Sequence, residues 1–185
     1  DYTVTVKVGD EGVNAHGYEA VFSSQGGGLM RYKLLGFFRV PLDDSPENRM
    51  IMLDRMAPGR DSLRVDTMSY GVGRQGMETQ RLREYPHELV EIPAWAEVTP
   101  EPGPEVTRGE QLVFRTVVGD WEVRRVYSFP GHGGGADFTI GLDLEWRNLS
   151  GENRMLSYIL VGPAGMLADD DSPQVPTTHI LAAPQ

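Results

Sequence analysis

The 185-residue sequence contains no cysteine. This excludes a disulfide framework, a Cys-ligated metal and a thiol nucleophile. No apolar run approaches the ~18 residues that a membrane-spanning helix needs, and no charged-then-apolar signal peptide opens the chain. Because the sequence starts at Asp1 without a Met, we expect a fragment of a longer protein, with any membrane anchor outside it.

Positive charge is also scarce. Seventeen Lys and Arg stand against 27 Asp and Glu, a net charge of −10. This balance argues against a nucleic-acid partner, whose phosphates would be repelled, and gives no attraction to anionic lipid. The chain is otherwise of ordinary globular composition, 39% hydrophobic and 24% charged. Its length favours one domain over residues 1–185.

Helix signals are few. Residues 77–90 could carry a short helix, but Pro86 would break it. Alternation of apolar and polar residues recurs instead, which predicts strands. The clearest are residues 2–8, 18–24, 111–118, 121–129, 138–146 and 155–161. We predict an all-β, mainly antiparallel sandwich of two packed sheets with little helix.

The last four of these strands are expected to form an antiparallel meander. Gly119-Asp120 is a two-residue hairpin connection between the first two. In residues 121–129 the apolar face is interrupted only by Arg125. The third strand carries an apolar stripe that we predict to be a buried inner face: Phe138, Ile140, Leu142, Leu144 and Trp146. Residues 96–110, with three prolines, indicate an exposed loop.

Three consecutive glycines, Gly26 to Gly28, lie between two predicted strands in FSSQGGGLMRYKL. A phosphate-binding loop would need Lys and a hydroxyl residue after the last glycine, opening a helix. Here Leu-Met-Arg-Tyr follows and resumes the alternation. We therefore predict a chain reversal between residues 18–24 and 29–35, with the extra glycine absorbing a bulge.

Two other glycine motifs are interpreted as loops. GVGRQG, residues 71–76, matches the dinucleotide fingerprint, but that site needs a parallel βαβ unit, and antiparallel strands are expected here. GHGGG, residues 131–135, contains the HGGG string of some esterase oxyanion holes. No serine lies on the GxSxG elbow that this chemistry also requires.

The titratable residues form no convincing site. The histidines are scattered without metal-binding spacing: His16, His87, His132 and His179. Residues 169–171, all Asp, lack the pattern of a calcium loop. Asp143 and Glu145 share a strand face like a glycosidase pair, but alternation places that face in water. We assign no catalytic, cofactor-binding or metal-binding residue, and we predict that the domain is not an enzyme.

Three stretches together resemble the periplasmic domain of YidC-type membrane protein insertases. They are VFSSQGGGLMRYKLLGF (residues 21–37), WEVRRVYSFPG (121–131) and FTIGLDLEWRNLSGENRMLSYILVGPAG (138–165). They resemble that family's Phe-Ser/Thr-x-x-Gly-Gly turn, its x-V-x-K-x-Y-x-F strand, and its Y-x-I-x-L-x-V-x-V-x-N-x-S strand with the following Y-x-L-x-G-P-x-G segment. They occur in the family's order and cover about half the chain; residues 43–110 match nothing in it.

The resemblance implies a β-super-sandwich similar to galactose-mutarotase domains, without their chemistry. It implies a domain that faces the periplasm from the bacterial inner membrane and assists the insertion and folding of inner-membrane proteins. The implied partners are nascent membrane proteins and Sec translocon components of the SecD/SecF type, with no cofactor. The alternatives are a carbohydrate-binding or aldose-epimerase-like protein on the same sandwich and, third, a plain adhesion or scaffolding sandwich.

Overall fold

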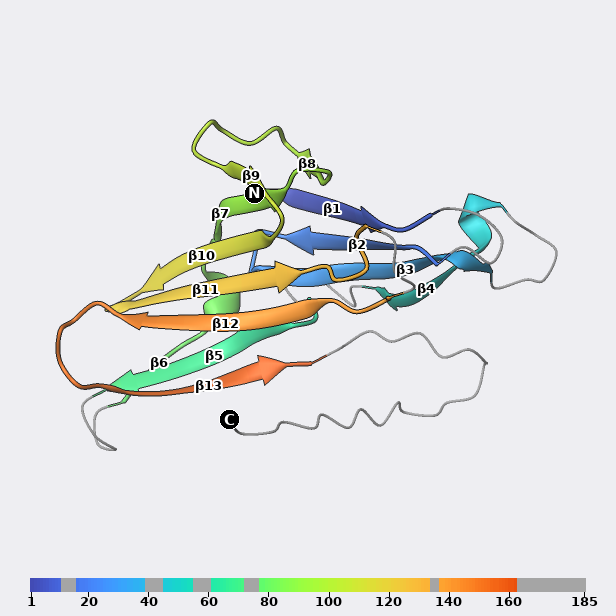
Figure 1. Cartoon of the computed structure of the whole chain (residues 1–185). Helices are drawn as coiled ribbons and strands as arrows, with labels where there is room; N and C mark the ends of the chain where they lie inside the picture. The colour runs from blue at the N-terminus through green and yellow to red at the C-terminus, as the bar shows by residue number, and fades with distance from the viewer. Residues whose placement is uncertain (11–15, 39–44, 55–60, 72–76, 134–136, 163–185) are drawn as a thin grey trace, which may run out of the picture.

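The computed structural model describes residues 1–10, 16–38, 45–54, 61–71, 77–133 and 137–162. These residues form β-strands and only two short 3-10 turns, so the all-β prediction is confirmed (Figure 1). The strands are β1 (Thr3–Val8), β2 (Tyr18–Ser23), β3 (Gly28–Phe38), β4 (Arg49–Asp54), β5 (Arg64–Gly71), β6 (Glu78–Gln80), β7 (Glu88–Pro93), β8 (Glu97–Thr99), β9 (Thr107–Gly109), β10 (Leu112–Val118), β11 (Trp121–Ser128), β12 (Gly141–Asn148) and β13 (Met155–Val161). The turns are η1 (Pro46–Asn48) and η2 (Leu82–Glu84).

The strands assemble into three sheets, where the alternation had predicted two. The first sheet has the order β4-β3-β2-β1-β8, the second β12-β11-β10-β7-β9, and the third β13-β5-β6. Every pairing is antiparallel except that of β7 with β9. The third sheet arises because β5 and β6 form a hairpin of their own, to which β13 is added.

The predicted meander is confirmed for β10, β11 and β12 and wrong for β13. Val118 pairs with Trp121 across the two-residue turn, where Gly119 has a φ of +57°. β13 pairs with β5 instead of β12. The turn after β12 carries the chain across to the opposite sheet, so that Tyr158 of β13 stacks on Trp146 of β12, with ring centroids 4.9 Å apart. Alternation determines which face of a strand is apolar, but it does not determine which strand lies beside it.

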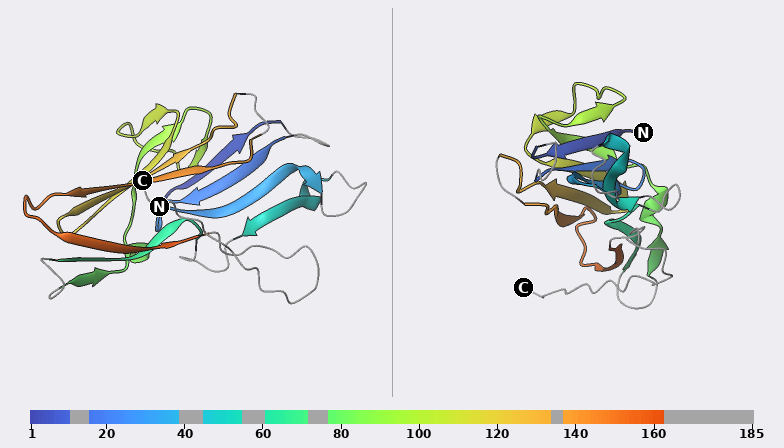
Figure 2. Two further views of the ribbon diagram at one scale, coloured as in Figure 1. Left: turned by 60° about the horizontal axis from the view of Figure 1, so that its bottom comes forward. Right: turned by 90° about the vertical axis from the view of Figure 1, so that its right-hand side faces the viewer.

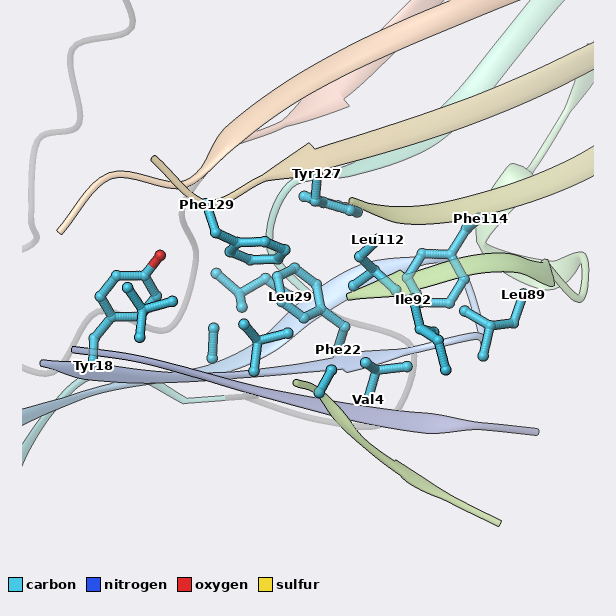
Figure 3. Close-up of a cluster of buried hydrophobic side chains, with 14 of the residues drawn as sticks. Val4, Tyr18, Phe22, Leu29, Leu89, Ile92, Leu112, Phe114, Tyr127 and Phe129 are labelled. Carbon is cyan, nitrogen blue, oxygen red and sulfur yellow. The ribbon is translucent and has the colours of Figure 1, made fainter. Parts of the chain in front are cut away.

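The second sheet packs against both of the others and so carries two apolar cores. Its β7, β10 and β11 cover the first sheet through a main core, shown in Figure 3, in which Phe22 lies 4.7 Å from Tyr127 by ring centroids. The far ends of β10 and β11 cover the third sheet through a smaller core that includes Met68 and Val123. In Figure 2 the strands β10, β11 and β12 extend past the first sheet, and the third sheet covers them there.

The apolar stripe of residues 138–146 faces the two cores as predicted. Phe138, Ile140 and Leu142 pack against the main core, and Leu144 and Trp146 against the smaller one. All five are half-buried and not fully buried: Phe138 and Ile140 precede β12, and β12 itself is an edge strand of its sheet. The opposite face of β12, as expected, lies in water.

Two segments that lacked a clear pattern form short elements. Residues 77–90 contain β6, the single turn η2 and the start of β7, and no α-helix. Residues 96–110, predicted to be a loop, contribute β8 and β9, three residues each, to the edges of the first and second sheets.

Candidate functional site

The three-glycine turn reverses the chain between β2 and β3, as predicted. Gly26 and Gly27 have φ values of +83° and +60°, a left-handed region that favours glycine. The bulge lies elsewhere: Val21 pairs with Arg31 while Phe22 pairs with Leu29. The extra residue is therefore Met30, and the prediction that a glycine absorbs the bulge is wrong.

The glycine turn is hydrogen-bonded to buried polar side chains that link all three sheets. Arg125 of β11 is fully buried, and its guanidinium donates a hydrogen bond through Nη1 to the Gly26 carbonyl. The Tyr127 hydroxyl donates to the Gly27 carbonyl at 2.7 Å and lies 3.1 Å from the carbonyl of Leu63, which leads into β5. We call these five residues, together with His87, the three-sheet junction.

Close approach within the junction gives Gly27 a second requirement besides its φ. A Cβ atom there would lie 2.8 Å from Nη1 of Arg125 and 3.0 Å from Cδ2 of His87. Both neighbours are buried side chains, so neither can move away without disturbing the core. A phosphate loop is excluded, because the turn leads into strand β3 and not into a helix.

The protonation states of the junction suit a structural role. Burial lowers the pKa of Arg125 to about 10 and raises the pKa of Tyr127 to about 12. Burial, and secondarily the positive charge of Arg125, lowers the pKa of His87 to about 3. At neutral pH the guanidinium is charged, the phenol is protonated and the imidazole is neutral. None of the three has the pKa near 7 that favours general acid–base catalysis.

The depressed pKa of His87 predicts that acid destabilises the fold. The unfolded state takes up a proton below about pH 6.5, whereas the folded state resists protonation until about pH 3. The stabilisation is therefore complete above pH 6.5 and is lost as the pH falls. Between about pH 7 and about pH 4.5 the free energy of unfolding should fall by about 2–3 kcal/mol from this residue.

Urea unfolding of the parent and His87→Asn at both pH values measures this effect. The Asn amide can replace the ring Nδ1, which lies 3.0 Å from the Tyr85 carbonyl, but it does not titrate. We expect the variant to lose less stability on acidification. Equal losses in the two proteins would show that other groups cause the acid sensitivity.

An apolar groove opens on the surface beside the main core. It has a volume of about 510 Å³. Its walls come from β3, β4, the residue before β5 and the segment before β12: Leu29, Tyr32, Leu34, Phe37, Met52, Leu53, Leu63, Phe138 and Ile140. Phe37 is 45% exposed and Met52 is 39% exposed. These two large apolar side chains are therefore accessible at the mouth of the groove.

Two tyrosines hold one wall of the groove in place. The Tyr32 hydroxyl donates to the Phe138 carbonyl at 2.6 Å, and the Tyr18 hydroxyl donates to the Thr139 carbonyl at 3.3 Å. Burial raises the pKa of both phenols. Among the described residues that line the groove, Tyr32 alone has a polar side chain, and its hydroxyl is already engaged. The groove can bind an apolar group by burying its surface, and its lining within the described part of the chain presents no acid, base or nucleophile.

A smaller hollow of about 300 Å³ lies at the end of β11. Trp95 and His132 stack there with ring centroids 3.4 Å apart. Glu110, Gln111 and Ser128 also line it. It combines aromatic surface with polar groups, in contrast to the apolar groove.

The structure separates the histidines considered in the sequence. His87 is buried in the junction, His132 stacks on Trp95, and His16 lies beside Phe138 with ring centroids 6.2 Å apart. His179 lies outside the described residues, as do the aspartates of residues 169–171. Within the part of the chain that the structure describes, no three His, Cys, Asp or Glu side chains cluster closely enough to hold a metal ion.

The other residues and motifs considered in the sequence lie on an exposed strand face, at a strand end or in a turn. Asp143 and Glu145 are exposed, and Glu145 pairs with Arg124 at 2.7 Å. Gly71 of the GVGRQG motif ends β5, which pairs antiparallel with both neighbours, contrary to a dinucleotide site; residues 72–76 lie outside the described part. Residues 131–133 of GHGGG form a turn after β11, and 134–135 are not described.

No helix among the described residues is both long enough and apolar enough to cross a membrane. The comparisons with protein-family models, curated proteins and solved structures found no match to the chain.

Sequence reasoning missed both the junction and the groove. The junction had one signal, Arg125 on the apolar face of an alternating strand. A buried Arg needs acceptors, and glycine carbonyls in a tight turn can supply them. The groove had none, because its lining comes from segments as distant as Leu29 and Ile140 that only the fold brings together.

Proposed function

We propose that the chain is the periplasmic domain of a YidC-type membrane protein insertase. In this proposal the domain is not an enzyme and needs no cofactor. It faces the periplasm from the bacterial inner membrane and helps inner-membrane proteins to insert and fold, alone or with Sec translocon components of the SecD/SecF type. The three stretches that resemble the family support it. They correspond to the β2–β3 reversal, to β11, and to β12 with β13.

The apolar groove is the observation on which this proposal chiefly rests. A protein that assists membrane insertion must contact segments that are long, apolar and uncharged. The groove offers a surface of matching chemistry, with Phe37 and Met52 exposed at its mouth. Burial of apolar surface contributes about 25 cal/mol per Å², so a groove of this kind favours aliphatic side chains over polar ligands. We infer that it receives apolar segments of nascent membrane proteins.

Binding of a defined apolar peptide tests the proposal. The probe is a fluorescent peptide of about 20 Leu and Ala residues, the length of a membrane span, with lysines at both ends for solubility. Fluorescence anisotropy should show binding to the parent chain. Phe37→Glu should weaken binding about tenfold or more, because it removes an apolar contact and places a carboxylate at the mouth of the groove.

Val117→Glu is the matched control. Val117 of β10 is 44% exposed, about as much as Phe37, and does not line the groove. The Val117→Glu variant should bind the peptide with an affinity within about twofold of that of the parent, since surface substitutions usually have small effects. A parent chain that fails to bind the peptide, or a Phe37→Glu variant that binds it as tightly as the parent, would refute the groove's role.

The alternative function, carbohydrate binding or aldose epimerisation, has one observation in its favour. The hollow at Trp95 and His132 has an aromatic stack next to Glu110 and Gln111. Titration with galactose and glucose tests it. Saturable binding that Trp95→Ala abolishes, or turnover lost in His132→Ala, would favour the alternative over the insertase proposal.

A further inference from the structure

The outer edge of β13 is unusual for an exposed strand. β13 is an edge strand of the third sheet, and no described strand pairs with its outer side. Its sequence, MLSYILV, contains no charge, no proline and no glycine. Large apolar side chains on it are exposed: Met155, Tyr158, Ile159 and Leu160, with Ile159 at 60%.

The other edge strands of the described part are protected in the ways expected for soluble sheets. Edge strands present unpaired backbone N–H and C=O groups, which proteins guard with charged residues or short length. β6, β8 and β9 are three residues long and each carries a charge. β12 carries Asp143, Glu145 and Arg147, and β4 carries Arg49 and Asp54. Among the edge strands that the structure describes, β13 alone has neither protection.

Among the described strands β13 pairs only with β5, and one of its faces packs towards the smaller core. Leu156 packs against the smaller core, and Tyr158 stacks on Trp146 of β12. The strand is therefore held in an extended conformation, with its register set against β5 over residues 155–161. A preformed, rigid edge of this kind can accept an added strand through main-chain hydrogen bonds while apolar side chains pack beside it.

We infer that the edge of β13 binds an extended, uncharged segment of an unfolded membrane protein as an added β-strand. The inference rests on the proposed function, because it specifies how the client is held. Its position supports this occupant: Val161 at the end of β13 pairs with Arg64, and the preceding residue, Leu63, lines the apolar groove. One segment can thus engage the edge and continue towards the groove.

Charge favours this occupant over a second copy of the chain. Two copies, each with a net charge of −10, repel one another. Membrane-spanning segments are largely uncharged and meet no such repulsion.

The test uses the same fluorescent Leu/Ala peptide and a second version whose central seven residues carry N-methylated backbone amides. N-methylation removes the donors needed for strand pairing but leaves the side chains and charge unchanged. We expect the methylated peptide to bind the parent about tenfold or more weakly. Ile159→Lys should weaken binding of the unmethylated peptide to a similar degree, because a lysine on an edge strand hinders pairing with an added strand. Val117→Lys, on β10 inside the second sheet, should bind like the parent.

The outcomes separate this inference from the proposed function. If both peptides bind equally and Ile159→Lys has no effect while Phe37→Glu still weakens binding, the groove role stands and the strand-addition inference is wrong. If the peptide does not bind the parent at all, both fail. If sedimentation shows a dimer that Ile159→Lys dissociates, the edge is a self-association surface and the inference is overturned. Circular dichroism of each variant verifies that it is folded.

Discussion

Arg125→Ala is expected to lower the free energy of unfolding by about 3–4 kcal/mol. The substitution leaves the Gly26 carbonyl buried without its donor, which costs about 1–3 kcal/mol. It also empties the space of a large, fully buried side chain, and cavities of that kind cost a further ~2 kcal/mol or more. Relief of the desolvation of the charge offsets part of the sum. Urea unfolding at neutral pH measures the change.

Arg124 supplies a control of the same residue type, one position away on the same strand. Its side chain points to the other face of β11, where it is 38% exposed and pairs with Glu145. Exposed ion pairs contribute about 0.2–1 kcal/mol, so Arg124→Ala should remain within about 1 kcal/mol of the parent. Equal effects of the two substitutions would contradict the junction's role.

Arg125→Met separates packing from hydrogen bonding at the junction. Met refills most of the space with a flexible apolar side chain but cannot donate to Gly26. We expect a loss of about 1–3 kcal/mol, the cost of the unpaired carbonyl alone. A variant as stable as the parent would show that the fold needs the volume of Arg125 and not its hydrogen bonds, as occurs when buried ions are replaced by apolar residues.

Phe22→Ala should lower the free energy of unfolding by about 3–5 kcal/mol, the usual cost of deleting a buried phenylalanine. Phe22 of β2 is fully buried and contacts Tyr127 and Phe129 of the opposing sheet, with ring centroids 4.7 and 6.0 Å away. It therefore contributes directly to the contact between the first and second sheets. Aromatic pairs of this kind add about 0.5–1.5 kcal/mol beyond their buried area.

Phe37→Ala is the control for that prediction, measured by the same denaturant unfolding. Phe37 lies on the adjacent strand β3 and is 45% exposed, so its truncation leaves no closed cavity. We expect a loss of no more than about 1 kcal/mol. If Phe22→Ala unfolds at the same denaturant concentration as Phe37→Ala, the main core does not hold the two sheets together as described.

The strands themselves could be predicted from the sequence because alternation is a local property. β10, β11 and β13 lie within a residue of their predicted bounds, and the turn at Gly119 follows from two residues. The partner of β13 could not be predicted, because β5 and β12 both present an apolar face to it. That choice depends on how the whole chain packs.

The candidate site shows the same division between local and non-local information. Gly26 and Gly27 were predicted to reverse the chain, which is a local requirement of φ. Their contact with Arg125, about a hundred residues later, is not encoded locally. The groove depends even more on the fold, since Leu29, Met52 and Ile140 come together only when three separate segments of the chain have folded side by side.

The most direct test of the groove is a methyl NMR titration with the apolar peptide. We predict that the peptide shifts the resonances of the methyl groups that line the groove, those of Leu29, Leu34, Met52, Leu53, Leu63 and Ile140. The methyl groups of Met68 and Val123 in the smaller core should stay unchanged, and galactose should shift none of them. If the groove resonances stay in place at saturating peptide, or shift with galactose instead, the groove does not bind apolar segments as proposed.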